Sequence, residues 1–390
     1  MPAPPMISAA TQLPAPSSDA LHLSNALVMR IREELESAGG WLDFSRYMQL
    51  ALYAPGLGYY SAGSTKFGAA GDFITAPELG SLLGRALART LASELRGVAA
   101  PTILELGAGS GKLAAQILDA LGELGRGGAA YRILEPSADL RERQQRHLRR
   151  FGDRVTWISR LPQTPTEGAV IANEVIDAQP VTRFIKHGGE TCPVGVAYRD
   201  GRFVWQAGAP SRDLTTAVER LEGKLSAALP DGYVSEICLL LPTLIDSLGA
   251  SLRRGSLIFV DYGMARRDYY HEQRNGGTLI CHYRHLAHDD PFLYPGLTDV
   301  SAWVDFSACA DAAVSAGLAV AGFTTQAQFL LGTLAESAPG PAPGQAGVEE
   351  LNALKTMLLP GEMGERFKVL LLRKNLDSGP LPGRDFRDRL

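Results

Sequence analysis

Apolar positions follow two different spacings along the chain, and the change between them divides the sequence. Near the start they recur at helical intervals, as in residues 25–38, which end at Gly39-Gly40. From Ala100 on, short apolar runs alternate with helical patterns, which is typical of parallel strands joined by helices. The runs that we expect to form strands are 102–106, 131–135, 155–158, 169–172, 256–260, 318–323 and 366–372. The pattern therefore predicts an α/β fold with a doubly wound parallel sheet.

Interruptions of this pattern suggest how the chain is divided. Residues 1–22 are rich in Pro, Ala and Ser, and we expect a disordered leader there. Hairpin-like runs follow residue 180, with a turn at Arg199–Arg202, and they indicate an inserted β-rich unit. The expected parts are a helical and lid region at 23–98, a core at 99–180 and 255–375, an inserted substrate-side subdomain at 181–254, and a flexible tail at 376–390.

A glycine-rich turn, Gly107-Ala-Gly-Ser-Gly111, directly follows the apolar run 102–106 and precedes a helical pattern. Glycines let the main chain turn sharply and approach a ligand closely. In a dinucleotide fingerprint the third glycine comes five positions after the first, whereas Gly111 follows Gly107 by four. With Glu105 inside the strand, the turn resembles the first motif of class I S-adenosylmethionine (SAM) methyltransferases. We expect Gly107, Gly109 and Gly111 to contact SAM and Glu105 to reach its amino group.

Other residues at strand ends extend this predicted cofactor site, because open parallel sheets bind ligands at the carboxyl ends of their strands. Glu135 ends the second strand and can accept hydrogen bonds from ribose hydroxyls, or it is an exposed acid at a strand end. Asn173 is expected beside the cofactor at the end of the fourth strand. Residues 58–78, which include Thr75, are either a surface loop or a lid over the cofactor.

Several motifs outside the turn are similar to those of the MidA family, the SAM methyltransferases that act as complex I assembly factors. The similarity spans about residues 25 to 375, although Val175-Ile176 stands where family members often carry aromatics. The resemblance implies a class I methyltransferase fold with a mostly parallel seven-stranded sheet, SAM as the cofactor, and methylation of an arginine on a protein such as a complex I subunit. The motifs are 58–61, 71–78, 103–111, 135–137, 173–178, 261–263, 277–279 with Tyr283, 299–300 with 304–306, and 367–370.

Two acids after the fourth strand are the candidate catalytic residues. Glu174 and Asp177 are three positions apart, so one helical turn would place both carboxylates on a common face. Carboxylates can hold a protonated guanidinium and stabilise charge as the new bond forms. We therefore expect Asp177, with Glu174, to orient the target nitrogen. The alternatives are that they cap a helix or pair with an arginine, and that Asp261, a further candidate, is a structural turn acid.

Composition limits the other functions that need to be considered. The net charge of −4 argues against broad nucleic-acid binding, and no apolar run is long enough to cross a membrane. We expect no metal site, because His282, His285 and His288 would not share one face of a helix. Widely spaced cysteines and the lack of an evident signal sequence favour the cytoplasm.

Two functions besides protein arginine methylation stay open at this point. One is a non-catalytic complex I assembly chaperone that retains the fold, and the other is a methyltransferase acting on small molecules. The intact glycine turn and the acids Glu174 and Asp177 favour catalysis, because a pure scaffold does not need them. The sequence does not determine the oligomeric state, and a homodimer is compatible with it.

Overall fold

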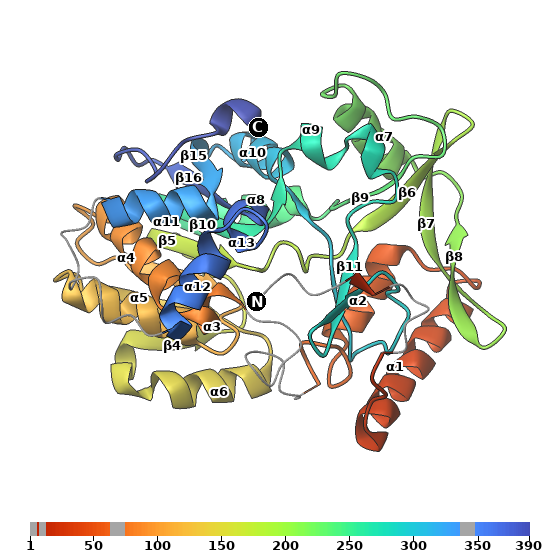
Figure 1. Ribbon diagram of the computed structural model, residues 1–390, viewed down its shortest axis with the longest axis horizontal. Coiled ribbons are helices and arrows are strands. Elements are labelled where there is room, and N and C mark those ends of the chain that lie inside the picture. Colours follow the sequence, from red (N-terminus) through yellow and green to blue (C-terminus); the bar gives the residue numbers. More distant parts are fainter. Residues whose placement is uncertain (1–5, 8–12, 63–74, 336–347) are drawn as a thin grey trace.

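A central, mostly parallel sheet organises the chain (Figure 1). The computed structural model describes residues 6–7, 13–62, 75–335 and 348–390. Five neighbouring strands run parallel, β16 is antiparallel to both of its neighbours, and the short β14 (Val304–Asp305) pairs with β10. This arrangement confirms the predicted α/β class. In spatial order the strands are β15 (Ala319–Thr325), β16 (Phe367–Lys374), β10 (Leu252–Met264), β5 (Thr166–Asn173), β2 (Thr102–Leu106), β3 (Ala130–Leu134) and β4 (Val155–Ile158).

Helices cover both faces of this sheet, because successive strand residues point to opposite sides. Ile258 and Val260 of β10 pack into one buried cluster, whereas Leu257 and Phe259 pack into another. The first cluster is completed by α3 (Ala76–Leu79), α4 (Leu82–Glu94), α5 (Lys112–Glu123), α6 (Ala138–Leu148), α11 (Gln326–Ala335), α12 (Val348–Leu358) and α13 (Met363–Arg366). The second is completed by α8 (Leu241–Ala250) and α10 (Phe306–Ser315). The continuous apolar runs in the sequence are therefore explained by burial on both faces.

A second, four-stranded sheet lies to one side of the core in the order β8-β7-β6-β9, and α1 (Ser18–Ser37) and α2 (Phe44–Tyr53) contact it (Figure 1). The helix α1 begins within the stretch expected to be a leader, because the Ser17 side chain caps it by accepting from the Ala20 amide at 3.3 Å. The inserted unit also contains a helix that the sequence reading missed. Its elements are β6 (Thr182–His187), β7 (Glu190–Arg199), β8 (Arg202–Ala207), α7 (Arg212–Glu222) and β9 (Val234–Ile237).

The stretch from residue 276 to residue 305, which we expected to be irregular, carries most of a third small sheet. Its strand order is β1-β12-β11-β13, formed by β1 (Met6–Ile7), β12 (Leu286–His288), β11 (Ile280–Tyr283) and β13 (Asp299–Ser301). Two short helical turns, α9 (Arg266–Tyr269) and η2 (Glu272–Arg274), precede this region. Two others lie elsewhere in the chain, η1 (Arg149–Arg154) and η3 (Arg387–Arg389). The segment thus joins the N-terminal helices to the core.

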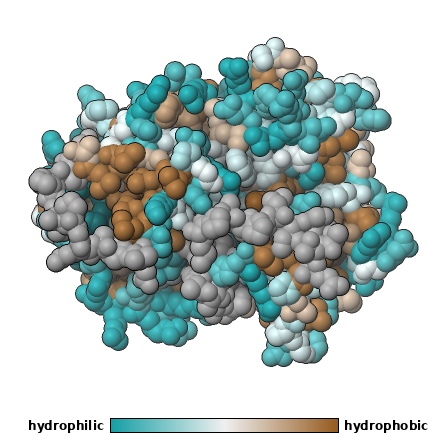
Figure 2. All heavy atoms as spheres, viewed as in Figure 1, coloured by the Kyte–Doolittle hydropathy of each residue, from teal (hydrophilic) through white to brown (hydrophobic). Residues whose placement is uncertain are grey.

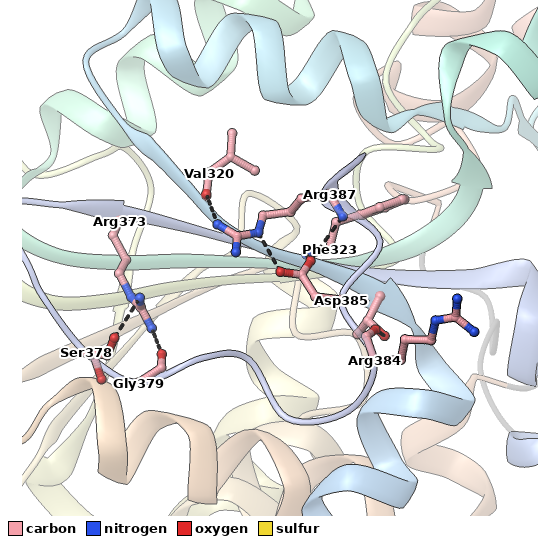
Figure 3. Close-up of polar contacts among 9 residues, drawn as sticks. Val320, Phe323, Arg373, Ser378, Gly379, Arg384, Asp385 and Arg387 are labelled. Carbon is pink, nitrogen blue, oxygen red and sulfur yellow. Dashed lines mark hydrogen bonds and ion pairs between the residues drawn. The ribbon is translucent and has the colours of Figure 1, made fainter. Parts of the chain in front are cut away.

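The last residues of the chain lie against the edge strand β15 (Figure 3). The Phe386 amide donates to the Phe323 carbonyl at 2.7 Å, and the Phe323 amide donates to Asp385 Oδ1 at 3.2 Å. Arg387 donates to the Val320 carbonyl at 3.1 Å. The segment that we expected as a flexible tail is therefore hydrogen-bonded along the sheet edge.

One hydrophobic patch is visible on the surface where α11 and α12 lie (Figure 2). Its exposed leucines are Leu331 and Leu334 on α11, Leu351 on α12 and Leu359 just after it. No helix within the described residues is long and apolar enough to span a bilayer.

Candidate functional site

A cavity of about 880 Å³ opens where the strands β2, β3 and β5 end at their carboxyl edge. Its size falls within the range of about 300–1,000 Å³ that is usual for small-molecule sites. Gly111 does not line it and instead caps α5, while Asp177 and Asp261 lie outside its lining. The predicted residues that do line it are Thr75, Glu105, Gly107, Gly109, Glu135, Asn173 and Glu174.

The glycine turn uses a backbone conformation that other residues rarely adopt. The φ angles of Gly107, Gly109 and Gly111 are 58°, 52° and 83°, which is the left-handed region. A Cβ at Gly107 would lie 3.3 Å from Val175 Cγ2, which is a tight contact. Glycine at this position therefore allows the loop after β5 to pass close to the turn.

Glu135 is tied to the glycine turn through Gln144, a residue that sequence reasoning missed. Glu135 is 3% exposed, and its Oε1 accepts from the Ser137 amide at 3.0 Å. The Gln144 amide nitrogen donates to Glu135 Oε2 and to the Gly109 carbonyl, both at 3.0 Å, and Trp157 donates to its oxygen at 2.9 Å. Since Gln144 lies on α6, only the folded chain brings it to the turn. Burial raises the pKa of Glu135.

Glu105 is 2% exposed in the floor of the cavity. The Tyr131 hydroxyl donates to its Oε2 at 2.9 Å from the neighbouring strand β3. Burial raises the pKa of Glu105 to about 7, with the nearby Glu135 adding to the effect. The free carboxyl can therefore take up or release a proton near neutrality, according to what fills the cavity.

Thr75 lies at the cavity because the helix α3 that it begins is fixed to the glycine turn. Glu78 accepts from the Ser110 hydroxyl at 2.6 Å and forms an ion pair with Lys112 at the start of α5. Gln116 of α5 donates to the carbonyls of Pro77 and Gly80 at 2.9 and 3.1 Å. The central part of the expected lid, residues 63–74, lies outside the described residues.

Asp261, at the carboxyl end of β10, binds the loop that carries Glu174 and Asp177. Its Oδ2 accepts from the amides of Val175, Ile176 and Asp177 at 3.2, 2.8 and 3.3 Å, and its Oδ1 accepts from the Tyr262 amide at 2.8 Å. The side chain is 0% exposed, and burial raises its pKa to about 7. The loop forms a turn in place of the helical turn that we expected.

Replacing Asp261 by Asn tests how strongly this carboxylate holds the loop. One end of the Asn side chain is an NH2 group, which cannot accept from a backbone N–H, so at least one of these amides loses its acceptor and we expect the free energy of unfolding to fall by about 1–3 kcal/mol. Urea unfolding measures this change, and an Asp153→Asn variant, at an exposed position, serves as the control. Equal stability of the two variants would contradict the assigned contact.

The acids around this loop form a cluster in which Asp177, Asp261 and Asp299 are buried and Glu174 is half-buried. Glu174 has an unusual φ of 54°, and burial together with the charge of Asp261 raises its pKa to about 8. Asp177 is 8% exposed, its Oδ1 has no hydrogen-bond partner, and burial beside Asp261 and Asp299 raises its pKa well above the usual range. Tyr60 donates to Asp299 at 3.0 Å. No ion pair among the described residues includes Glu174 or Asp177, so the cluster lacks the arginine partner considered as an alternative.

Metal binding finds no support in the part of the chain that the structure describes. Within those residues no group of three His, Cys, Asp or Glu side chains is placed to hold an ion. His282 and His288 lie on the paired strands β11 and β12, and burial lowers the pKa of His282 to about 4.

The strand order, the glycine turn after β2, the acid after β3 and the cavity at the carboxyl edge define a class I SAM-dependent methyltransferase. Residues 82–324 match the family described as "Putative S-adenosyl-L-methionine-dependent methyltransferase". The chain belongs to this family, and its relatives identify it as MidA-type. SAM is accordingly the cofactor, and the open glycine turn beside buried Glu105 and Glu135 fits it.

Solved and curated relatives agree with this assignment. A chain from Burkholderia thailandensis bound to S-adenosyl-homocysteine is 42% identical, with 97% of this chain and 100% of that chain covered and a TM-score of 0.89. The mitochondrial protein arginine methyltransferase NDUFAF7 homolog of Drosophila melanogaster is 26% identical over 97% of this chain and 93% of its own. The mitochondrial protein arginine methyltransferase NDUFAF7 of Rattus norvegicus is 27% identical, with 92% of this chain and 86% of that protein covered. Since both curated relatives are named mitochondrial, our expectation of a cytoplasmic protein is wrong.

Proposed function

We propose that this methyltransferase acts on an arginine side chain of a protein. The observation that carries the proposal is the buried acid cluster beside the cofactor cavity, where Asp177 keeps one carboxylate oxygen without a partner. A guanidinium remains protonated at neutral pH and matches carboxylates with a fork of N–H donors. The relatives named protein arginine methyltransferase support the same substrate class. The MidA resemblance adds a complex I subunit as the kind of protein expected.

Each part of the site has a distinct role in this proposal. Residues Thr75, Glu105, Gly107, Gly109, Glu135 and Asn173 hold SAM, and Gly111 shapes the turn. SAM supplies an electrophilic methyl group. Glu174 and Asp177 hold the guanidinium in line with that group, because alignment in a dry site provides most of the rate. Asp261 is a positioning residue, since its oxygens are occupied by main-chain amides.

The product guanidinium must also lose one proton from the nitrogen that gains the methyl group. Glu174 lines the cavity, and its pKa of about 8 in the free site lies near neutrality. A base with a matched pKa accepts a proton efficiently. We assign this acceptance to the Glu174 carboxylate, while Asp177 keeps the guanidinium oriented.

The raised pKa of Glu174 predicts a pH-dependent stability of the free protein. Below its ordinary pKa of 4.5 the carboxyl is neutral in both folded and unfolded chains. Between 4.5 and about 8 the folded protein holds a proton that the unfolded chain has released, so stability falls as the pH rises through this window. We expect the melting temperature to drop between about pH 4.5 and pH 8, and to drop less in Glu174→Gln. The exposed Glu272→Gln is the control, and an unchanged slope in Glu174→Gln would refute the assignment.

The function itself is tested with SAM carrying a labelled methyl group. The purified protein is incubated with proteins of its own source organism, and labelled bands are digested and analysed for methylarginine by mass spectrometry. Label on arginine supports the proposal. Label in a low-molecular-weight fraction would identify a small-molecule methyltransferase, and SAM binding without any transfer would identify an assembly chaperone that retains the fold.

A further inference from the structure

A second cavity, of about 1020 Å³, lies at the same edge of the sheet but beside β10, β16 and β15. Its wall is formed by the end of β10 at Gly263-Met264, by Trp303, by α11 and α13, and by the C-terminal segment with Phe386. It shares no lining residue with the cofactor cavity. The roles proposed above do not use it.

The charged side chains of this cavity are predominantly basic, although the whole chain has a net charge of −4. Two acids, Asp268 and Glu365, also line it. Lys368 is half-buried, and burial lowers its pKa to about 8 although the charges of Glu365 and Asp268 act to raise it. The cations in the lining are Arg274, Arg366, Lys368, Arg384 and Arg389.

These five cations are not held in ion pairs with carboxylates of the described residues, although Asp268 and Glu365 lie in the same lining. None of the ion pairs formed between described residues includes any of the five. Nearby Arg387 does pair with Asp385, whereas the Arg384 side chain points away from that pair (Figure 3). Arg274 and Arg389 lie instead over the rings of Trp303 and Phe386, at 5.7 and 4.7 Å. The cavity therefore presents an excess of positive charge, with five cations against the two acids Asp268 and Glu365.

The basic cavity begins next to the acid cluster. Asp261 and Gly263 are two residues apart on β10, which corresponds to about 7 Å along an extended strand. A second connection runs along the other wall, where Asp299 contacts Tyr60 and the Ala302 amide donates to the Asp177 carbonyl at 3.0 Å. Trp303, the next residue, already lines the basic cavity. Two segments, β10 and residues 299–303, therefore run from the acid cluster directly to the basic cavity.

We propose that the basic cavity binds an acidic segment of the protein whose arginine is methylated. This inference rests on the proposed function, because the acid cluster is taken as the place where the arginine binds. With about 3.3 Å per residue of extended chain, the acidic residues are expected about two to four positions from the arginine. A target with Asp or Glu at that distance before or after the arginine can place the arginine in the acid cluster and the acidic residue in the basic cavity at the same time. A target with Lys or Arg at those positions is repelled by the cations of the basic cavity.

The features of the cavity favour a peptide over a small anion. Its cations come from three separate regions, namely η2, the α13–β16 junction and the C-terminal segment. They do not belong to a single loop of the kind that surrounds one small anion. Apolar side chains such as Trp303 and Phe386 lie between them and suit the body of a peptide.

The experiment compares two fluorescein-labelled peptides by fluorescence anisotropy in the presence of S-adenosylhomocysteine. Both contain one arginine, and they carry either Glu or Gln at the third and fourth positions after it. We expect the Glu peptide to bind about tenfold more tightly, because two or three partly exposed ion pairs are formed. The double variant Arg366→Glu/Arg389→Glu should remove this difference and leave the Gln peptide unaffected. Arg96→Glu is the matched control, since Arg96 is exposed on the segment leading into β2, at the opposite sheet edge.

Equal binding of both peptides to the unchanged protein, or a difference that survives the double variant, would overturn the inference. So would displacement of the Glu peptide by micromolar inorganic phosphate, which would assign the cavity to a free anion. Methyl transfer to the same peptides is measured separately. If the Glu peptide binds through the basic cavity but is never methylated, the proposed function fails and the cavity assignment holds. If both peptides are methylated with the same kcat/KM, the assignment fails and the function holds.

Discussion

Replacement of Asp177 by Asn is expected to lower the rate of methyl transfer on the order of 10²–10³-fold, because a preorganised charge at the reacting centre contributes that much. The substitution keeps the shape of the side chain but removes the charge that holds the guanidinium. SAM affinity should change little, since Asp177 does not line the cofactor cavity. Single-turnover transfer to an arginine-containing substrate and calorimetric titration with SAM measure the two quantities.

Two controls make this result interpretable. Asp153→Asn changes the same residue type at an exposed position and should leave transfer unaffected. The melting temperature of Asp177→Asn should be equal to or above that of the unchanged protein, because a buried carboxyl without a partner at Oδ1 is costly to ionise. Full turnover in a folded Asp177→Asn protein would rule out the assigned role.

Replacement of Gly109 by Val is expected to abolish detectable SAM binding. Gly109 has a φ of 52° and lines the cofactor cavity, so a branched side chain is strained there and is directed into space that the ligand needs. A strained backbone position of this kind costs about 1–3 kcal/mol of folding stability, and the loss of SAM affinity comes from the overlap of the added side chain with the ligand. Calorimetric titration with SAM or S-adenosylhomocysteine is the measurement.

The chain offers a close control for the backbone part of this effect. Gly125 also has a positive φ, of 69°, but a Cβ added there would meet nothing within 4 Å. Gly125→Val should therefore lose some stability through strain and still bind SAM normally. If Gly109→Val bound SAM as well as Gly125→Val does, the turn would not be the cofactor site.

Features that depend on local sequence were predictable. The apolar runs and the glycine turn determine where strands end, so Glu105, Glu135, Asn173 and Glu174 were expected at one edge, and the structure brings all four to one cavity. These signals are carried by residues next to each other in the chain.

Features that depend on packing between distant segments were not predictable. Gln144 reaches the glycine turn only because α6 packs beside β3, and no spacing in the sequence distinguishes it from a surface glutamine. Asp261 was expected as a catalytic candidate. The parallel pairing of β10 with β5 instead places its carboxylate where it accepts hydrogen bonds from main-chain amides of the loop after Asn173. The turn at 174–178, formed where a helical turn was expected, follows from those same hydrogen bonds.

The C-terminal segment has a consequence for how copies of this protein behave toward one another. A sheet that ends in an open strand exposes N–H and C=O groups on which a second copy can add its own strand. Residues 384–387 hydrogen-bond to Val320 and Phe323 of the outer strand β15. The C-terminal segment therefore covers this edge of the sheet. A chain shortened after Asn375 would expose the bare edge, and fibrous or ladder-like self-association, rather than loss of the cofactor site, would be its characteristic defect.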